Sequence, residues 1–88
     1  MYFDWNVDKN SEIKKQRGIG FEDFITAFEE DKVLDIIEHH LPHKYPNQKL
    51  FIVEINSYIH YVPFVMNDET YFLKNIIPSR KYHKQYKG

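Results

Sequence analysis

Apolar residues recur at helical spacing in the first third of the chain. Four of them share the i, i+3, i+4, i+7 pattern of one helix stripe: Phe21, Phe24, Ile25 and Phe28. Gly20 stands where a helix cap is expected, and the acidic residues that follow it favour the positive end of a helix dipole. We expect this stripe to face the core, because large apolar side chains at this spacing are usually buried.

The segment before the stripe predicts a second helix with little apolar character. Asn6 suits the N-cap and Gly18 the end, which predicts a helix from about Val7 to Arg17 with Asp8 in its first turn. Ile13 is nearly its only interior apolar residue. We therefore expect a surface helix that exposes its basic side chains, namely Lys9, Lys14, Lys15 and Arg17. Residues 2–5 fit either a short strand or an anchored aromatic segment.

From residue 32 the apolar period changes to two, which is typical of strands. Four strands are predicted: Val33–Ile37, Lys49–Ile55, Tyr58–Val65 and Thr70–Ile77. Prolines in residues 39–48 predict a loop there, Asn56-Ser57 fits a two-residue hairpin connection, and Asn67-Asp68 fits a turn. Pro63 interrupts the third strand, which favours an edge position or a bulge.

The order of these elements predicts a single α+β domain over residues 1–88, with two N-terminal helices packed on an antiparallel meander of about four strands. Fourteen Phe and Tyr residues and one Trp enlarge a core that would otherwise be small for 88 residues. The chain has no cysteine, and no apolar run approaches the ~20 residues that span a bilayer. Its first five residues do not resemble a signal peptide, so we expect a soluble cytoplasmic protein.

Charge is strongly segregated although the formal net charge is only −1. Residues 71–88 carry five basic side chains and no acid, whereas residues 22–38 carry seven acids and one lysine. Tyr82, His83 and Tyr86 interleave the basic end, a combination suited to phosphate contact and base stacking. The alternative is a frayed, solvated tail. The preceding predicted strand favours the first interpretation, since a sheet would hold residues 78–81 still.

Three motifs, in order along the chain, resemble those of BrnT-type toxins of type II toxin–antitoxin systems. The first is Phe3-Asp4-Trp5 followed by Asp8-Lys9-Asn10. The second is Lys-Gln-Arg-Gly-Ile-Gly-Phe-Glu-Asp at residues 15–23, and the third is Ile-Ile-Pro-Ser-Arg-Lys at residues 76–81. The chain departs from the family pattern at Arg17, Lys49 and near Tyr86, where that family usually has His, Arg and an acid. It therefore resembles a divergent branch.

The resemblance implies a RelE-like fold, an RNA substrate and a metal-independent endoribonuclease (mRNA interferase) activity. It also implies a hetero-oligomer with a ribbon-helix-helix (CopG-like) antitoxin from the same operon, lying across the basic face. Two alternatives stay open. One is a ParE-like poison that blocks a protein target such as a topoisomerase without chemistry, and the other is a small non-toxic interaction module.

Metal-free cleavage of RNA needs cations at the phosphate, a base for the 2′-hydroxyl and an acid for the leaving oxygen. Arg80 is the strongest candidate for the phosphate because its planar guanidinium can bind bidentately, and Lys81 could add charge. Glu22, His83 and Tyr86 are the candidates for the base, although Glu22 could instead serve only its helix N-terminus. Further RNA-binding candidates are basic residues spread along the chain: Lys14, Lys15, Arg17, Lys49, Lys74, Lys84 and Lys87.

Three histidines, His39, His40 and His43, raise the question of a metal site. Pro42 breaks the helix that would align the outer two, and cysteine ligands are absent. We therefore expect no metal and no other cofactor, and an exposed loop at these residues.

Overall fold

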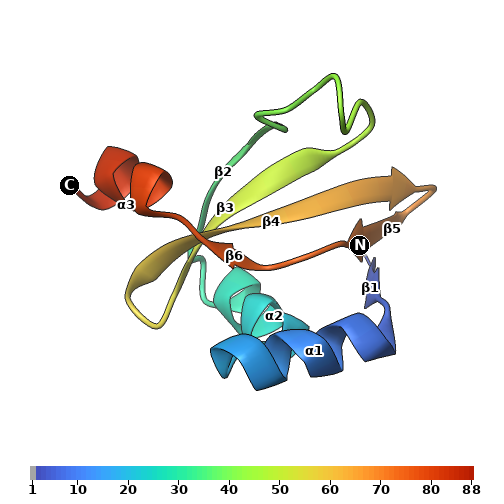
Figure 1. Ribbon diagram of the computed structural model, residues 1–88, viewed down its shortest axis with the longest axis horizontal. Helices are drawn as coiled ribbons and strands as arrows, with labels where there is room; N and C mark the ends of the chain where they lie inside the picture. Colours follow the sequence, from blue (N-terminus) through green and yellow to red (C-terminus); the bar gives the residue numbers. More distant parts are fainter. Residues whose placement is uncertain (1) are drawn as a thin grey trace.

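The computed structural model describes residues 2–88 as a six-stranded mixed sheet with three helices (Figure 1). The helices are α1 Val7–Arg17, α2 Phe21–Glu29 and α3 Arg80–Lys87. The strands are β1 Tyr2–Trp5, β2 Val33–Glu38, β3 Lys49–Ile55, β4 Tyr58–Asn67, β5 Thr70–Leu73 and β6 Ile77–Pro78. The order across the sheet is β1-β5-β4-β3-β2, and β6 pairs with β4 outside this path.

Helices α1 and α2 form where the caps and the apolar spacing predicted them. The Asn6 side chain accepts a hydrogen bond of 2.9 Å from the Lys9 N–H, and Gly18 ends α1 in the left-handed conformation with φ 72°. The Gly20 N–H donates to the Asp23 carboxylate at 2.8 Å at the start of α2. These two predictions are confirmed, including the exposed character of α1.

The expected four-stranded meander describes only part of the sheet. Strands β2, β3, β4 and β5 do pair antiparallel in sequence order, and Asn56-Ser57 joins β3 to β4. However, the aromatic segment at residues 2–5 is a strand that pairs parallel with β5, so the sheet is mixed. The pairing was not predictable from local pattern, because it joins segments almost seventy residues apart.

The last predicted strand, Thr70–Ile77, is wrong as one element. β5 ends at Leu73, and the chain reaches β6 only at Ile77. Between the pairs Phe64–Leu73 and Tyr61–Ile77, three residues face two residues of β4, which is one residue too many for a regular ladder. Pro63 lies at this irregularity in an interior strand, and its carbonyl accepts from the Lys74 N–H at 2.7 Å. The bulge alternative is thus the one the structure supports, and the edge alternative is wrong.

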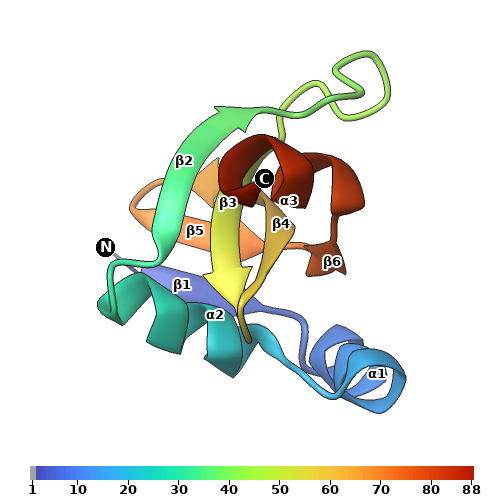
Figure 2. The ribbon, with the colours of Figure 1, turned by 90° about the vertical axis from the view of Figure 1, so that its left-hand side faces the viewer.

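The basic C-terminal segment is not a frayed tail. It follows β6, which pairs with β4, and continues as a third helix. Ser79 caps α3 by accepting from the Tyr82 N–H at 3.1 Å, and Tyr82 is only 5% exposed. In Figure 2, α1 and α2 lie below the strands, whereas α3 lies in front of the upper part of β3 and β4. The buried side chains that pack with α3 come from the sheet face opposite to those that pack with α1 and α2. The expectation of two helices is therefore corrected to three, which cover both faces of the sheet.

Each face of the sheet has its own buried cluster. The cluster under α1 and α2 is the larger and contains Phe21, Phe24, Phe51, Phe64 and seven smaller aliphatic and alanine side chains, with Ile13 from α1. The cluster under α3 contains Leu50, Ile52, Ile59 and Tyr82. Because strand side chains alternate, β3 and β4 supply both clusters. No helix within residues 2–88 is long and apolar enough to cross a membrane.

Candidate nucleic-acid interface

Two adjoining cavities lie on the α3 side of the sheet. The first, of about 290 Å³, is lined by His40, Tyr61 and residues 77–82. The second, of about 270 Å³, is lined by residues 39–41, Tyr45, Gln48, Tyr61, Pro63, Lys74, Asn75 and Ile77. The cavities share His40, Tyr61 and Ile77. We call the combined feature, bounded by loop 39–48, β4, β6 and the first turn of α3, the tyrosine–histidine groove.

A larger cavity of about 740 Å³ lies beside β2, β3, β4 and β5. Lys49 is the one charged side chain among its lining residues, and most of the others are apolar, including Ile36, Phe64 and Met66. A nucleic-acid site needs several cations and accessible aromatic rings. We therefore place the candidate interface in the tyrosine–histidine groove, although its cavities are smaller.

Aromatic rings form a continuous wall along the groove. The ring of His39 lies 4.4 Å from that of Tyr45 and 4.7 Å from that of His40. His40 meets Tyr61 edge to face at 5.2 Å, and Tyr61 meets Tyr82 in the same way at 5.8 Å. These contacts bring together the loop, β4 and α3. His39 and Tyr82 are buried, so the rings on which an unpaired base could stack are the exposed His40 and the half-buried Tyr45 and Tyr61.

The groove's polar groups are largely held neutral. Burial, and then repulsion from His40, lowers the pKa of His39, whose Nδ1 accepts from the Leu41 N–H at 3.0 Å. Burial raises the pKa of Tyr61, and Arg17 opposes that shift. Burial also raises the pKa of Tyr82. Both phenols therefore stay protonated at neutral pH.

Positive charge comes from three exposed side chains, Lys74, Arg80 and Lys81, which line the cavities. The Lys81 ammonium lies 5.5 Å from the centre of the Tyr82 ring, and that of Lys74 lies 4.9 Å from the centre of the Phe72 ring. Arg80 begins α3, so the positive end of the helix dipole adds to its charge. Three basic residues that the sequence analysis predicted as RNA-binding or catalytic candidates thus line adjoining cavities.

Arg17 contacts the segment that leads into the groove but does not line the groove itself. Its Nη1 donates to the Ile76 carbonyl at 3.0 Å, which ties the end of α1 to the segment that precedes β6. Arg17 is not among the lining residues of either cavity. Its positive charge acts on His60 and Tyr61 through space.

Glu22 lies at the junction of α1 and α2, away from the groove's lining residues. Its carboxylate accepts from Asn10 Nδ2 at 3.0 Å and from Lys14 Nζ at 3.1 Å. The Asn10 hydrogen bond is the main reason that the pKa of Glu22 is lowered. Asn10 in turn accepts from the Phe21 N–H, which makes the group a brace between the helices. The structure places Glu22 and Lys14 in this brace.

His83 and Tyr86 lie on α3 but do not line the groove. His83 Nδ1 accepts from the Ile59 N–H at 3.2 Å, and its ring stacks on Tyr58 at 4.2 Å. The Tyr86 hydroxyl donates to Asp35 at 2.8 Å, and this hydrogen bond raises the pKa of Tyr86. Both side chains thus dock α3 on the sheet.

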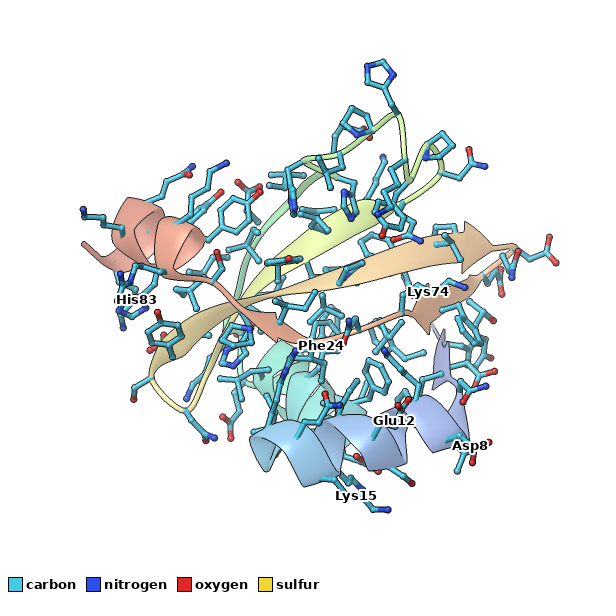
Figure 3. The ribbon with its side chains drawn as sticks, in the orientation of Figure 1. Asp8, Glu12, Lys15, Phe24, Lys74 and His83 are labelled. Carbon is cyan, nitrogen blue, oxygen red and sulfur yellow. The ribbon has the colours of Figure 1, made fainter. Side chains whose placement is uncertain are left out.

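The remaining basic candidates are dispersed. Lys87 pairs with Glu54 at 2.8 Å, and Lys49 lies 3.9 Å from Glu38 beside the larger cavity. Lys84 is exposed in the last turn of α3. Figure 3 shows Lys15 pointing away from the sheet on α1, and Lys74 and His83 well apart along the horizontal axis. The structure therefore does not gather all the basic candidates into one surface.

The structure adds His40, Tyr45 and Tyr61 to the candidate site, none of which the sequence pattern had selected as RNA-binding. In the sequence, Tyr61 has the period-two spacing of any strand residue, and the loop histidines raise only the question of a metal site. Within residues 2–88, no three histidine or carboxylate side chains are placed to hold a metal ion. Comparisons of the chain with protein-family models, with curated proteins and with solved structures find no match.

Proposed function

We propose that the tyrosine–histidine groove binds single-stranded RNA and that the protein is a cytoplasmic toxin of the endoribonuclease type, neutralised by a ribbon-helix-helix antitoxin. One observation carries this proposal: the first turn of α3 sets Arg80 and Lys81 against an aromatic wall that includes His40 and Tyr61. Cations beside accessible rings match a chain of phosphates and unpaired bases.

In this proposal Arg80 holds the scissile phosphate. A guanidinium binds two phosphate oxygens at once and stabilises the charge that builds up on them during cleavage. Lys81 adds charge on the same side, and Lys74 contacts a neighbouring phosphate at the far cavity. A paired helix would keep its bases stacked on one another, so the aromatic wall favours a single strand.

A protein target is the second candidate, supported by a different surface. β2 is an edge strand, and its Leu34 and Ile36 are 44% and 52% exposed. An edge strand with apolar side chains can pair with a strand of another protein. A toxin that blocks its target by such pairing would need no chemistry at the groove.

The test is binding of a fluorescent single-stranded RNA to the purified protein at several salt concentrations. Each phosphate neutralised contributes about −0.7 to the slope of log K against log salt, so the three groove cations predict a slope near −2. Arg80→Ala should weaken binding and reduce the slope by about 0.7. Arg80→Lys should restore binding only in part, because a point charge cannot bind bidentately.

Lys15→Ala is the matched control, since Lys15 is also an exposed cation but lies on α1 and lines neither cavity. Equal effects of Arg80→Ala and Lys15→Ala would mean that RNA binds only through general charge, which would contradict the proposed groove. Induction of the protein in growing cells, followed by mapping of new RNA ends, tests cleavage. Growth arrest without new ends, abolished by Ile36→Lys, would favour the protein-target alternative.

A further inference from the structure

The groove needs a group that can take a proton from the attacking hydroxyl. The three residues that sequence reasoning favoured for this step are engaged elsewhere. Glu22 is held by Asn10 and Lys14, His83 accepts from the Ile59 N–H, and Tyr86 donates to a carboxylate. None of the three lines either cavity.

We propose that His40 is the proton-transfer residue of the groove, taking the proton of the RNA 2′-hydroxyl that attacks the phosphate held by Arg80. This inference rests on the proposed ribonuclease function. His40 is exposed and lines both cavities. Arg80 and Lys81 line the cavity of about 290 Å³ together with it. Histidine is the side chain that most readily exchanges a proton near neutral pH.

Among the side chains that line the two cavities, all within residues 2–88, His40 is the one best placed to act as a base. The other histidine, His39, is buried and already accepts through Nδ1 from the Leu41 N–H. Tyr61 and Tyr82 face His40 from β4 and α3, while Tyr45 lies against the ring of the neighbouring His39. Phenols ordinarily titrate near pH 10. The charged groups lining the cavities are lysine and arginine, with no carboxylate among them.

Neighbouring contacts also fix the position of the His40 ring. It lies 4.7 Å from the His39 ring on one side and meets the Tyr61 ring edge to face at 5.2 Å on another. The buried His39 is itself pinned by its hydrogen bond and by Tyr45. A base held in one place is more effective than a mobile one, because reactive geometry is set before the reaction starts.

The step balances as a transphosphorylation. His40 takes the proton from the 2′-oxygen as that oxygen forms a bond to phosphorus, and the bond from phosphorus to the 5′-oxygen breaks. The leaving oxygen takes a proton from Lys81 or from water. The products are a 2′,3′-cyclic phosphate and a 5′-hydroxyl end, and no metal, oxidant or second substrate is consumed.

The test compares His40→Gln with His43→Gln in single-turnover cleavage of a single-stranded RNA, with affinity measured in parallel. His43 is an exposed histidine of the same loop that lines neither cavity. We expect His40→Gln to slow cleavage by about 100-fold or more, which is the usual scale for loss of a general base. This loss should be much larger than the weakening of binding caused by removing one ring of the aromatic wall. His43→Gln should cleave at the wild-type rate.

A pH profile and chemical rescue separate proton transfer from stacking. Wild-type cleavage should fall on acidification as the imidazole takes up a proton, and this acid limb should be absent in His40→Gln. Free imidazole should partly restore cleavage to His40→Gly. Wild-type-like cleavage by His40→Gln, or a loss fully explained by weaker binding, would overturn the role of His40 alone. Absence of cleavage by the wild-type protein would overturn the proposed function as well.

Discussion

The two faces of the sheet are built from the same strands but differ in how completely they are covered. On the α1 and α2 face, twelve buried side chains form the main cluster, and its aromatic members are phenylalanines. On the α3 face, four buried side chains form the cluster, and the rings around it are tyrosine and histidine. Two helices close the first face, whereas the eight residues of α3 close only part of the second.

Because of this difference, the α1 and α2 face contributes mainly to stability, whereas the α3 face offers rings that can contact a ligand. Phe51 and Phe64 stack at 4.1 Å with no polar atom to satisfy, so their burial contributes apolar free energy directly. Tyr61 is half-buried and His40 is exposed, and both rings carry polar atoms. Rings of that kind can meet a ligand without leaving a buried polar group unpaired. The α3 face of the sheet, which the helix covers only in part, is therefore the face that can bind a ligand.

The largest expected effect comes from removing a ring on the closed face. Phe24 is fully buried between α2 and the sheet and contacts Phe3 and Phe51. Phe24→Ala should lower the free energy of unfolding by about 3–5 kcal/mol through lost burial and a cavity. Urea unfolding followed by circular dichroism measures this. Val7→Ala, at a residue 73% exposed, is the control and should change stability little.

A smaller loss is expected on the open face. Tyr82 is 5% exposed but belongs to the four-residue cluster, whose surroundings can relax more easily. Tyr82→Ala should cost about 2–3 kcal/mol, toward the lower end for large-to-small changes. It should also weaken RNA binding, since Tyr82 lines the groove. A cost as large as that of Phe24→Ala would mean that the two faces are equally tight.

Local signals made the closed face predictable. The caps at Asn6 and Gly18 and the phenylalanine stripe of α2 act within a few residues, so they predict elements without knowledge of the rest of the fold. Gly20 at the start of α2 is another signal that acts within a few residues. The parallel pairing of β1 with β5 had no such signal, because it depends on contacts between distant segments.

The open face was predicted only in part. Charge and the planar guanidinium of Arg80 predict Arg80, Lys81 and Lys74 as phosphate-binding candidates, and the structure places them on one groove. α3 was missed because its only apolar positions, Tyr82 and Tyr86, are embedded among charged residues, although Ser79 before them is a helix-capping signal. The sequence pattern relates His40 only to the question of metal binding, because its proximity to α3 arises from the fold.

Acidification should destabilise both faces, through one buried histidine on each. Burial lowers the pKa of His60, which lies near Arg17, and that of His39 beside the groove. The unfolded chain then binds protons more readily, so this stability is complete above pH ~6.5 and is lost as pH falls through the lowered values. Denaturant unfolding from pH 8 to pH 5 measures the loss.

Variants assign this acid effect to each face. His60→Gln and His39→Gln should each flatten the pH dependence. His43→Gln, in the exposed loop, should leave the dependence unchanged. An unchanged curve in both buried-histidine variants would assign acid sensitivity to other groups.

The smallest expected effect tests how α3 is held at its outer end. The Tyr86 hydroxyl donates to Asp35 at 2.8 Å near the surface, while its ring packs against the small cluster. Tyr86→Phe keeps the ring and removes the hydrogen bond, so it should cost only about 0.5 kcal/mol at neutral pH. The hydrogen bond raises the pKa of Tyr86, so its contribution is complete below pH ~10 and is lost as pH rises through the higher value.

Tyr86→Phe also separates docking of α3 from chemistry in the groove. Tyr86 does not line either cavity, so RNA cleavage by this variant should match the wild-type rate, and the alkaline loss of stability should become smaller. Urea unfolding at pH 7 and pH 10.5, together with single-turnover cleavage, provides both measurements. Loss of cleavage without loss of stability would move the proton-transfer step from His40 to Tyr86. It would also mean that the outer end of α3, and not the groove, is the reactive part of the open face.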